Sequence, residues 1–323
     1  MTLDASITRL LNRLQATSRA AGPVLKRVFT AALMVLVVAL LVSQLKALDW
    51  HQVAASLGAF PAAALLGGIA LTALSYAIYC SFDLLGQRYA GHALTRQQVL
   101  KISFVSYAFG LNFGVAGLGL RYRWYSLLGV GAGVVARVYA VCLGTNWLGF
   151  ALLAGGMLAS GLIELPAQWR VGAIALQAVG AVLLVCALGY LLVCATSQRR
   201  AWTLRGHRIA LPSLRFALLQ AALSIANWLL IAAVLYALLG DRVAFAAVLG
   251  TLLVSSLALA VVDVPGGLGV TEAVFIAALG TRMPAAQLLA ALVAYRVIYF
   301  LAPLLPAALM YLAAERRFAS KPA

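Results

Sequence analysis

The chain has 323 residues, of which 64% are hydrophobic and 10% are charged. A mean hydropathy of +1.01 lies far outside the range of soluble globular proteins, and predicts an all-α polytopic membrane protein. The net charge of +16 arises from basic residues between the apolar runs, where the positive-inside rule expects them, so no nucleic-acid partner is predicted. All four cysteines lie inside apolar runs without metal-ligand spacing, so we expect neither disulfides, a metal site nor a cofactor.

The first 27 residues carry five basic side chains against one acidic side chain. Leucines recur at helical spacing opposite Arg9 and Arg13, which predicts a short amphipathic helix on the cytoplasmic leaflet. The charged region is too long for a signal peptide. We therefore assign residues 1–27 to a cytoplasmic amphipathic segment.

Apolar runs long enough to approach the roughly 20 residues of a spanning helix follow in order. Six are predicted to cross the membrane: 28–45, 62–85, 130–158, 171–195, 214–239 and 287–313. The positive-inside rule puts the basic N-terminus and the basic loop at 199–215 on the same side of the membrane, which requires an even number of crossings between them. A seventh run, 99–119, must therefore turn back without crossing. We predict that it forms a re-entrant hairpin, and that 244–262 and 270–281 form a second one.

The chain also contains one glycine motif twice, at a spacing of 150 residues. Gly117, Leu118 and Gly119 fall on Gly267, Leu268 and Gly269, and the same shift superimposes the predicted helices of 28–158 on those of 171–313. The two halves would cross the membrane in opposite directions, which is the inverted repeat of secondary transporters. We therefore treat 28–313 as one transmembrane domain, followed by a cytoplasmic tail, 314–323.

The glycine motifs are predicted to break the two hairpins inside the membrane. Non-helical backbone is tolerated at that depth only where it is buried in protein or lines a watery cavity. The predicted breaks are Gly117, Gly119, Pro265, Gly266, Gly267 and Gly269.

The strings SYAFGLNFGVAGLGLRYRWYSLLGV and VPGGLGVTEAVF resemble the two signature regions of one membrane family. That family is the transmembrane flippase domain of lysylphosphatidylglycerol synthases, which includes stand-alone bacterial inner-membrane proteins and relatives encoded with hopanoid biosynthesis. The resemblance spans 28–313, and the soluble synthase domain has no counterpart in this chain. It implies a multi-pass inner-membrane location and translocation or trafficking of a lipid.

Charged and aromatic residues beside the breaks are the candidate binding site. Arg121 and Arg123 offer guanidinium groups that match a phosphate, and Tyr122 and Tyr125 supply rings at headgroup depth. The alternative is a positive-inside flank with aromatic anchors. Asn112 is a weaker candidate, which would otherwise cap the hairpin by bonding free backbone groups.

Arg296 lies deep in the last apolar run, where a cation is costly unless it is paired. Asp263 and Glu272, on either side of the second break, are its predicted partners. These residues either belong to the binding site or only lock the hairpins together.

The leading functional prediction is a transporter or flippase for a phospholipid with an anionic headgroup. The alternatives are a membrane-embedded lipid-modifying transferase and a non-catalytic partner of lipid or hopanoid biosynthesis machinery. The hydrolase strings GxSxG and HExxH and a nucleotide-binding loop do not occur, so we expect no enzyme activity. The expected partner is a phospholipid or an isoprenoid or hopanoid lipid, with a homo-oligomer or biosynthetic proteins as further candidates.

The predicted topology places both termini in the cytoplasm. In a cysteine-free background, single cysteines near the N-terminus and at Arg205 should react with membrane-impermeant reagents from the same side. Labelling from opposite sides would contradict the even number of membrane crossings predicted between these two positions.

Overall fold

The structure is a computed structural model that describes residues 58, 60–161, 172–204, 207–261 and 269–319. These residues belong to one compact unit of the chain, Gln52–Ala323. The predicted amphipathic segment and the predicted first crossing, 28–45, lie outside the described residues.

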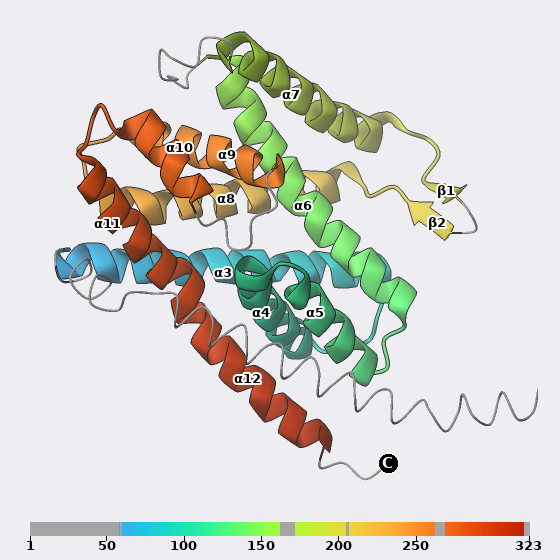
Figure 1. The fold of residues 1–323 in the computed structure, drawn as a ribbon. Coiled ribbons are helices and arrows are strands. Elements are labelled where there is room, and N and C mark those ends of the chain that lie inside the picture. The colour runs from blue at the N-terminus through green and yellow to red at the C-terminus, as the bar shows by residue number, and fades with distance from the viewer. Residues whose placement is uncertain (1–57, 59, 162–171, 205–206, 262–268, 320–323) are drawn as a thin grey trace, which may run out of the picture. The chain divides into compact units, whose positions relative to one another are not determined.

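Five described helices are long and apolar enough to cross a membrane. They are α3 (Ala62–Ala90), α6 (Ala132–Ala159), α7 (Gly172–Thr196), α8 (Leu214–Leu239) and the continuous helix Ala285–Arg316. Each coincides with a predicted crossing. Apart from one short hairpin of strands, every element of the described residues is helical (Figure 1). The predicted all-α polytopic membrane fold is therefore confirmed.

Four shorter helices form two pairs. Helix α4 (Arg96–Phe113) packs against α5 (Val115–Leu127), and α9 (Phe245–Val261) packs against α10 (Val270–Leu279). These pairs occupy the predicted positions of the two hairpins. The predicted break residues Pro265, Gly266 and Gly267 and the predicted ion-pair partner Asp263 lie outside the described residues.

The first hairpin turns at Gly114, not at the predicted Gly117 and Gly119. The backbone of Gly114 has a φ of 55°, in the left-handed region that favours glycine, and its N–H closes α4 on the carbonyl of Gly110. Gly117 and Gly119 lie inside α5. The prediction for these two residues is wrong because the reversal needs only one residue of positive φ, and Gly114 supplies it.

Helix α6 is the central packing partner. It contacts α3, α7 and α8, and α3 and α8 also pack extensively against each other. Between α6, α7 and α8, the small cluster of Leu148, Ala187 and Ala221 is buried. Glycine lets these helices pack closely where they contact each other, since a Cβ on Gly149 of α6 would overlap Ser224 of α8.

A two-stranded antiparallel hairpin connects α7 and α8. Its strands, β1 (Ala201–Leu204) and β2 (His207–Ala210), lie within the predicted basic loop. Tyr89, near the end of α3, donates a hydrogen bond to the carbonyl of Ala210. The end of α3 and the start of α8 therefore lie at the same end of the helix bundle.

Two glycines of α5 make a matched test of the hairpin packing. A Cβ on Gly117 would overlap the carbonyl of Ser106 and the backbone of Gly110, whereas a Cβ on Gly119 would meet nothing within 4 Å. We expect Gly117→Ala to destabilise the protein by about 1–3 kcal/mol, because α4 and α5 must separate. Gly119→Ala should leave stability unchanged or slightly raised, since alanine favours helices.

The measurement is thermal unfolding of purified protein in detergent, with the monodisperse yield as a second readout. Equal melting temperatures for the two variants would show that the α4–α5 contact is not tight.

Candidate functional site

The last long helix changes its winding at Arg296. Residues Arg296–Leu301 form a π-helical stretch, η3, between α11 (Ala285–Tyr295) and α12 (Ala302–Ala319). Two side chains from other helices bond its backbone carbonyls: Tyr76 donates to Tyr299 at 3.0 Å, and Asn112 donates to Phe300 at 3.1 Å. Short π-helical stretches occur frequently at functional sites.

A cavity of about 790 Å³ adjoins η3 and is lined by residues of both short hairpins and of α3, α6, α8 and α11. Its size falls within the roughly 300–1,000 Å³ of small-molecule sites. The uncharged polar residues of its wall, tyrosines aside, are Ser106, Asn146, Asn227, Ser255, Ser256 and Thr271. Asn146 and Asn227 lie near the middle of spanning helices, so the cavity is polar at a depth where the membrane is most apolar.

A chain of hydroxyl groups runs beside the cavity and includes Tyr107 and Tyr299 of its wall. Ser75 donates to Oδ1 of Asn227 at 2.7 Å and also bonds the Tyr299 hydroxyl at 2.9 Å. The Tyr299 hydroxyl in turn bonds the Tyr107 hydroxyl at 3.0 Å. The ring of Tyr107 stacks on that of Tyr79, with 3.5 Å between their centroids. This chain joins α3, α4, α8 and η3.

Arg296 and Glu272 form an ion pair that faces the cavity. Nε and one terminal nitrogen of Arg296 bond the two carboxylate oxygens of Glu272 at 2.7 and 3.1 Å. Glu272 also accepts the backbone N–H of Gly269 at the start of α10. Both side chains line the cavity and remain about one-fifth exposed, at 18% and 20%. The predicted pairing of Arg296 with Glu272 is therefore confirmed.

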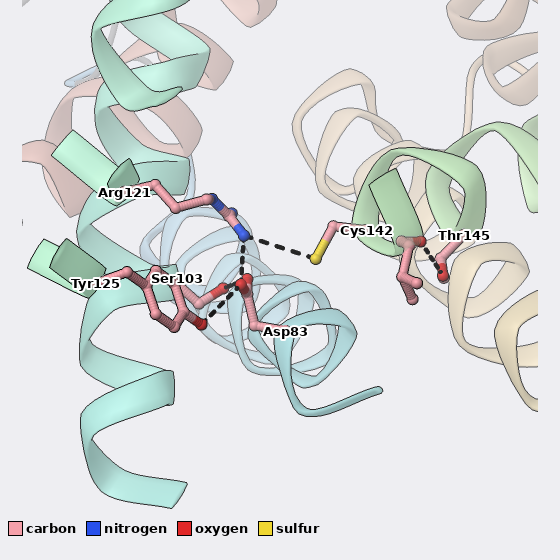
Figure 2. Close-up of polar contacts among 7 residues, drawn as sticks. Asp83, Ser103, Arg121, Tyr125, Cys142 and Thr145 are labelled. Atoms are coloured by element: carbon pink, nitrogen blue, oxygen red, sulfur yellow. Dashed lines mark hydrogen bonds and ion pairs between the residues drawn. The ribbon is translucent and has the colours of Figure 1, made fainter. Parts of the chain in front are cut away.

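Arg121 forms a second ion pair, with Asp83 of α3. Figure 2 shows Arg121 and Tyr125, one turn apart on α5, pointing at this carboxylate. Ser103 of α4 also donates to Asp83, and the side chains of Arg121 and Asp83 are only 3% and 0% exposed. The Arg121 guanidinium reaches Sγ of Cys142 at 3.6 Å, and the residue contributes to the cavity wall.

His92 lies in the loop between α3 and α4, edge-on to Tyr125 at 5.4 Å. Burial lowers its pKa below the usual value.

Arg123 lies outside the cavity. It makes a bidentate pair with Glu315 of α12, with both hydrogen bonds at 2.7 Å. This pair ties the end of α5 to the end of α12. Trp124 is buried and stacks on Tyr311, with 6.0 Å between the ring centroids.

The predicted site residues separate into two groups. The cavity is lined by Gly117, Arg121, Glu272 and Arg296, and not by Asn112, Gly119, Tyr122, Arg123, Tyr125 or Gly269. Tyr125, expected at headgroup depth, is fully buried against Asp83, whereas Tyr122 is 47% exposed. Asn112 bonds the backbone carbonyls of Ala108 and Phe300 and so joins α4 to η3, whereas the alternative expected it to cap the hairpin.

The tyrosines and the two asparagines of the cavity wall were not predicted from the sequence. The signal for Asn146 and Asn227 was present, because a carboxamide inside an apolar run tends to face the protein interior. The tyrosines carried no comparable signal. Among the described residues, no group of three His, Cys, Asp or Glu side chains lies close enough to hold a metal ion.

The buried Asp83–Arg121 pair should be needed for folding. Asp83→Asn leaves the Arg121 charge without its carboxylate, which should cost about 3–5 kcal/mol. The double substitution Asp83→Leu with Arg121→Met should recover most of that loss, because it removes both charges. Thermal unfolding in detergent of Asp83→Leu, of Arg121→Met and of the double variant gives the double-mutant cycle, in which additive losses would contradict direct coupling. Glu315→Gln, at the less buried pair with Arg123, is the control and should cost less.

Comparison with known proteins places the chain in a family of membrane proteins. The family model for the lysylphosphatidylglycerol synthase TM region matches residues 27–307. The chain is 42% identical over 293 residues to the inner membrane protein YbhN of Escherichia coli, covering 90% of this chain and 92% of the relative. It is 31% identical over 284 residues to the uncharacterised protein slr0712 of Synechocystis, covering 85% and 86%. The chain therefore belongs to the lysylphosphatidylglycerol synthase transmembrane-region family, and its helices are those of a multi-pass inner-membrane protein.

Proposed function

We propose that this protein transports a phospholipid and binds its anionic headgroup in the cavity, without catalysing a reaction on it. The observation that carries the proposal is the Arg296–Glu272 pair, which is partly exposed to a polar cavity among membrane helices. The Asp83–Arg121 pair is by contrast almost fully buried, and its carboxylate also accepts from Ser103, which is the arrangement of a pair that serves packing.

Arg296 is the phosphate ligand in this proposal. A guanidinium group donates two parallel hydrogen bonds to a phosphate as readily as to a carboxylate. Glu272 compensates the charge of Arg296 in the empty cavity, where an unpaired cation would be costly. An incoming phosphate competes with Glu272 for the same donors and adds one negative charge to the cavity, which protonation of the displaced Glu272 carboxylate balances.

Arg121 takes a positioning role here, in place of the phosphate contact expected from the sequence. Asp83 already accepts from its guanidinium, and the pair is buried. The pair holds α5 against α3 and so fixes the cavity wall formed by Gly114, Gly117 and Leu118.

The cavity mouth fits a lipid better than a free solute. Val115 and Leu118 both line the cavity, yet their side chains are 85% and 40% exposed. An apolar rim beside a polar interior matches a molecule with a polar headgroup and acyl chains. The volume of about 790 Å³ admits a headgroup while the acyl chains remain outside.

The repeat supports a transport mechanism. After the shift of 150 residues, α3, α4, α5 and α6 correspond in order to α8, α9, α10 and the helix Ala285–Arg316. Corresponding helices pack in corresponding ways, since α3 contacts α6 and α8 contacts α11. We propose that the halves are inverted, that both hairpins are re-entrant and that the two halves expose the cavity alternately to each leaflet.

We infer the orientation of the protein in the membrane from the end of the helix bundle at which its basic residues gather. The pair Arg123–Glu315 joins the end of α5 to that of α12, at the end where the basic β1–β2 loop also follows α7. The positive-inside rule makes this end cytoplasmic. We therefore propose that the C-terminus is cytoplasmic. The five described crossings and the predicted crossing 28–45 would then bring the N-terminus to the same side.

Replacing arginine by lysine at two bidentate pairs tests the function. In liposomes with labelled phosphatidylglycerol, Arg296→Lys should slow translocation about tenfold or more, because an ammonium group cannot make both hydrogen bonds. Arg123→Lys makes the same change outside the cavity and should leave the rate within about twofold.

Mass spectrometry of the same liposomes separates the alternatives. A new lipid species would indicate a transferase, and unchanged lipid with no translocation would indicate a non-catalytic partner. Equal rates for the wild type and Arg296→Lys would remove Arg296 from the transport path.

A further inference from the structure

Two carboxamide side chains of the cavity wall have hydrogen-bonding capacity that the described protein does not use. Asn227 is only 1% exposed and lines the cavity, and its one hydrogen bond is accepted by Oδ1 from Ser75. Its Nδ2 has no partner among the described residues. Asn146 lines the same cavity, and only its backbone carbonyl is bonded, by Ser224 at 3.0 Å and Trp228 at 3.4 Å.

The hydrogen bond from Ser75 to Oδ1 of Asn227 sets the direction of the hydroxyl chain. Each hydroxyl has one proton, and Ser75 donates its proton to Asn227, so the Tyr299 hydroxyl must donate to Ser75. The Tyr107 hydroxyl must then donate to Tyr299. Because this chain ends on the carbonyl oxygen, the NH₂ group of Asn227 is the part left for the cavity.

The two asparagines lie next to each other on the cavity wall. Ser224 and Trp228 flank Asn227 on α8, and both donate to the carbonyl of Asn146 on α6. The side chains of Asn146 and Asn227 therefore border the same stretch of the α6–α8 interface. Together they offer donors and an acceptor without net charge.

We propose that Asn146 and Asn227 form a second subsite of the cavity, which binds hydroxyl groups of the lipid headgroup. The inference rests on the proposed function and names the substrate class: a phospholipid whose headgroup carries free hydroxyl groups. A hydroxyl both donates and accepts, so it complements a carboxamide, whereas a buried amide without a partner is costly. The phosphate lies at Arg296, and the hydroxyls lie toward α6 and α8.

The test compares two short-chain lipids, dihexanoyl phosphatidylglycerol and dihexanoyl phosphatidylpropanol. They share acyl chains and one negative charge, and they differ only by the two hydroxyls of the headgroup. We expect the purified wild type to bind phosphatidylglycerol about tenfold more tightly, because a site built for hydroxyls leaves its amides unpaired with the analogue. Binding is measured by ligand-dependent thermal stabilisation, which requires no transport.

Asn146→Leu and Asn227→Leu should weaken binding of phosphatidylglycerol to the level of phosphatidylpropanol and leave binding of the analogue unchanged. The side chain of Asn146 makes no hydrogen bond in the described structure, so Asn146→Leu remains a valid test if Asn227→Leu folds poorly. Gln220→Leu is the control, because Gln220 of α8 bonds Thr145 of α6 outside the cavity and its loss should preserve the preference.

Equal affinity of the wild type for both lipids would overturn the subsite, since the amides would then face water only. Retained preference in Asn146→Leu would overturn it as well. In liposomes, translocation of both lipids at equal rates would overturn the subsite and leave the proposed function standing. Preferential binding without translocation of either lipid would overturn the function and leave the subsite standing.

Discussion

Inside a membrane, every polar group of the chain must find its partner within the protein, and the described structure is arranged around this constraint. An unpaired backbone group in hydrocarbon costs several kcal/mol. The carbonyls of Tyr299 and Phe300 in η3 are therefore bonded by Tyr76 and Asn112, from two other helices. These contacts make the irregular winding of η3 possible and, with it, the position of Arg296 at the cavity. A local departure from α-helix in the second half of the chain thus depends on side chains from the first half.

The same constraint explains why the two ion pairs near the cavity differ. Asp83 accepts hydrogen bonds from Ser103 and Arg121, and this group of side chains is almost fully buried. Glu272 instead bonds Arg296 and the start of α10, and both side chains of this pair keep part of their surface open to the cavity. Breaking the first pair would strand a buried charge. The second can exchange partners at lower cost, which is the property that an anion-binding site requires.

The sequence predicted what depends on one segment and missed what depends on contact between segments. The five described crossings were predicted because a long apolar run is a local property. The Arg296–Glu272 pair was predicted because a deep charge needs a partner and few were near. Asp83 was not assigned to Arg121, since their meeting depends on how α3 and α5 are rotated. The first hairpin turns at Gly114 and not at the predicted Gly117. Gly117 instead lies inside α5, where its lack of a side chain lets the helix pack against Ser106.

The lengths of the short helices account for the position of the cavity. Helices α5 and α10 have 13 and 10 residues, which at 1.5 Å per residue span roughly 20 and 15 Å, well short of the roughly 30 Å of a hydrocarbon core. Neither can cross, so the space beyond their ends is filled by other helices or left open. The cavity wall includes Gly114 and Val115 at the start of α5, and Thr271 and Glu272 at the start of α10. The cavity thus adjoins the point where each hairpin stops. Full-length helices in these positions would fill that space with side chains, so the shortness of the hairpins is what makes a polar interior possible.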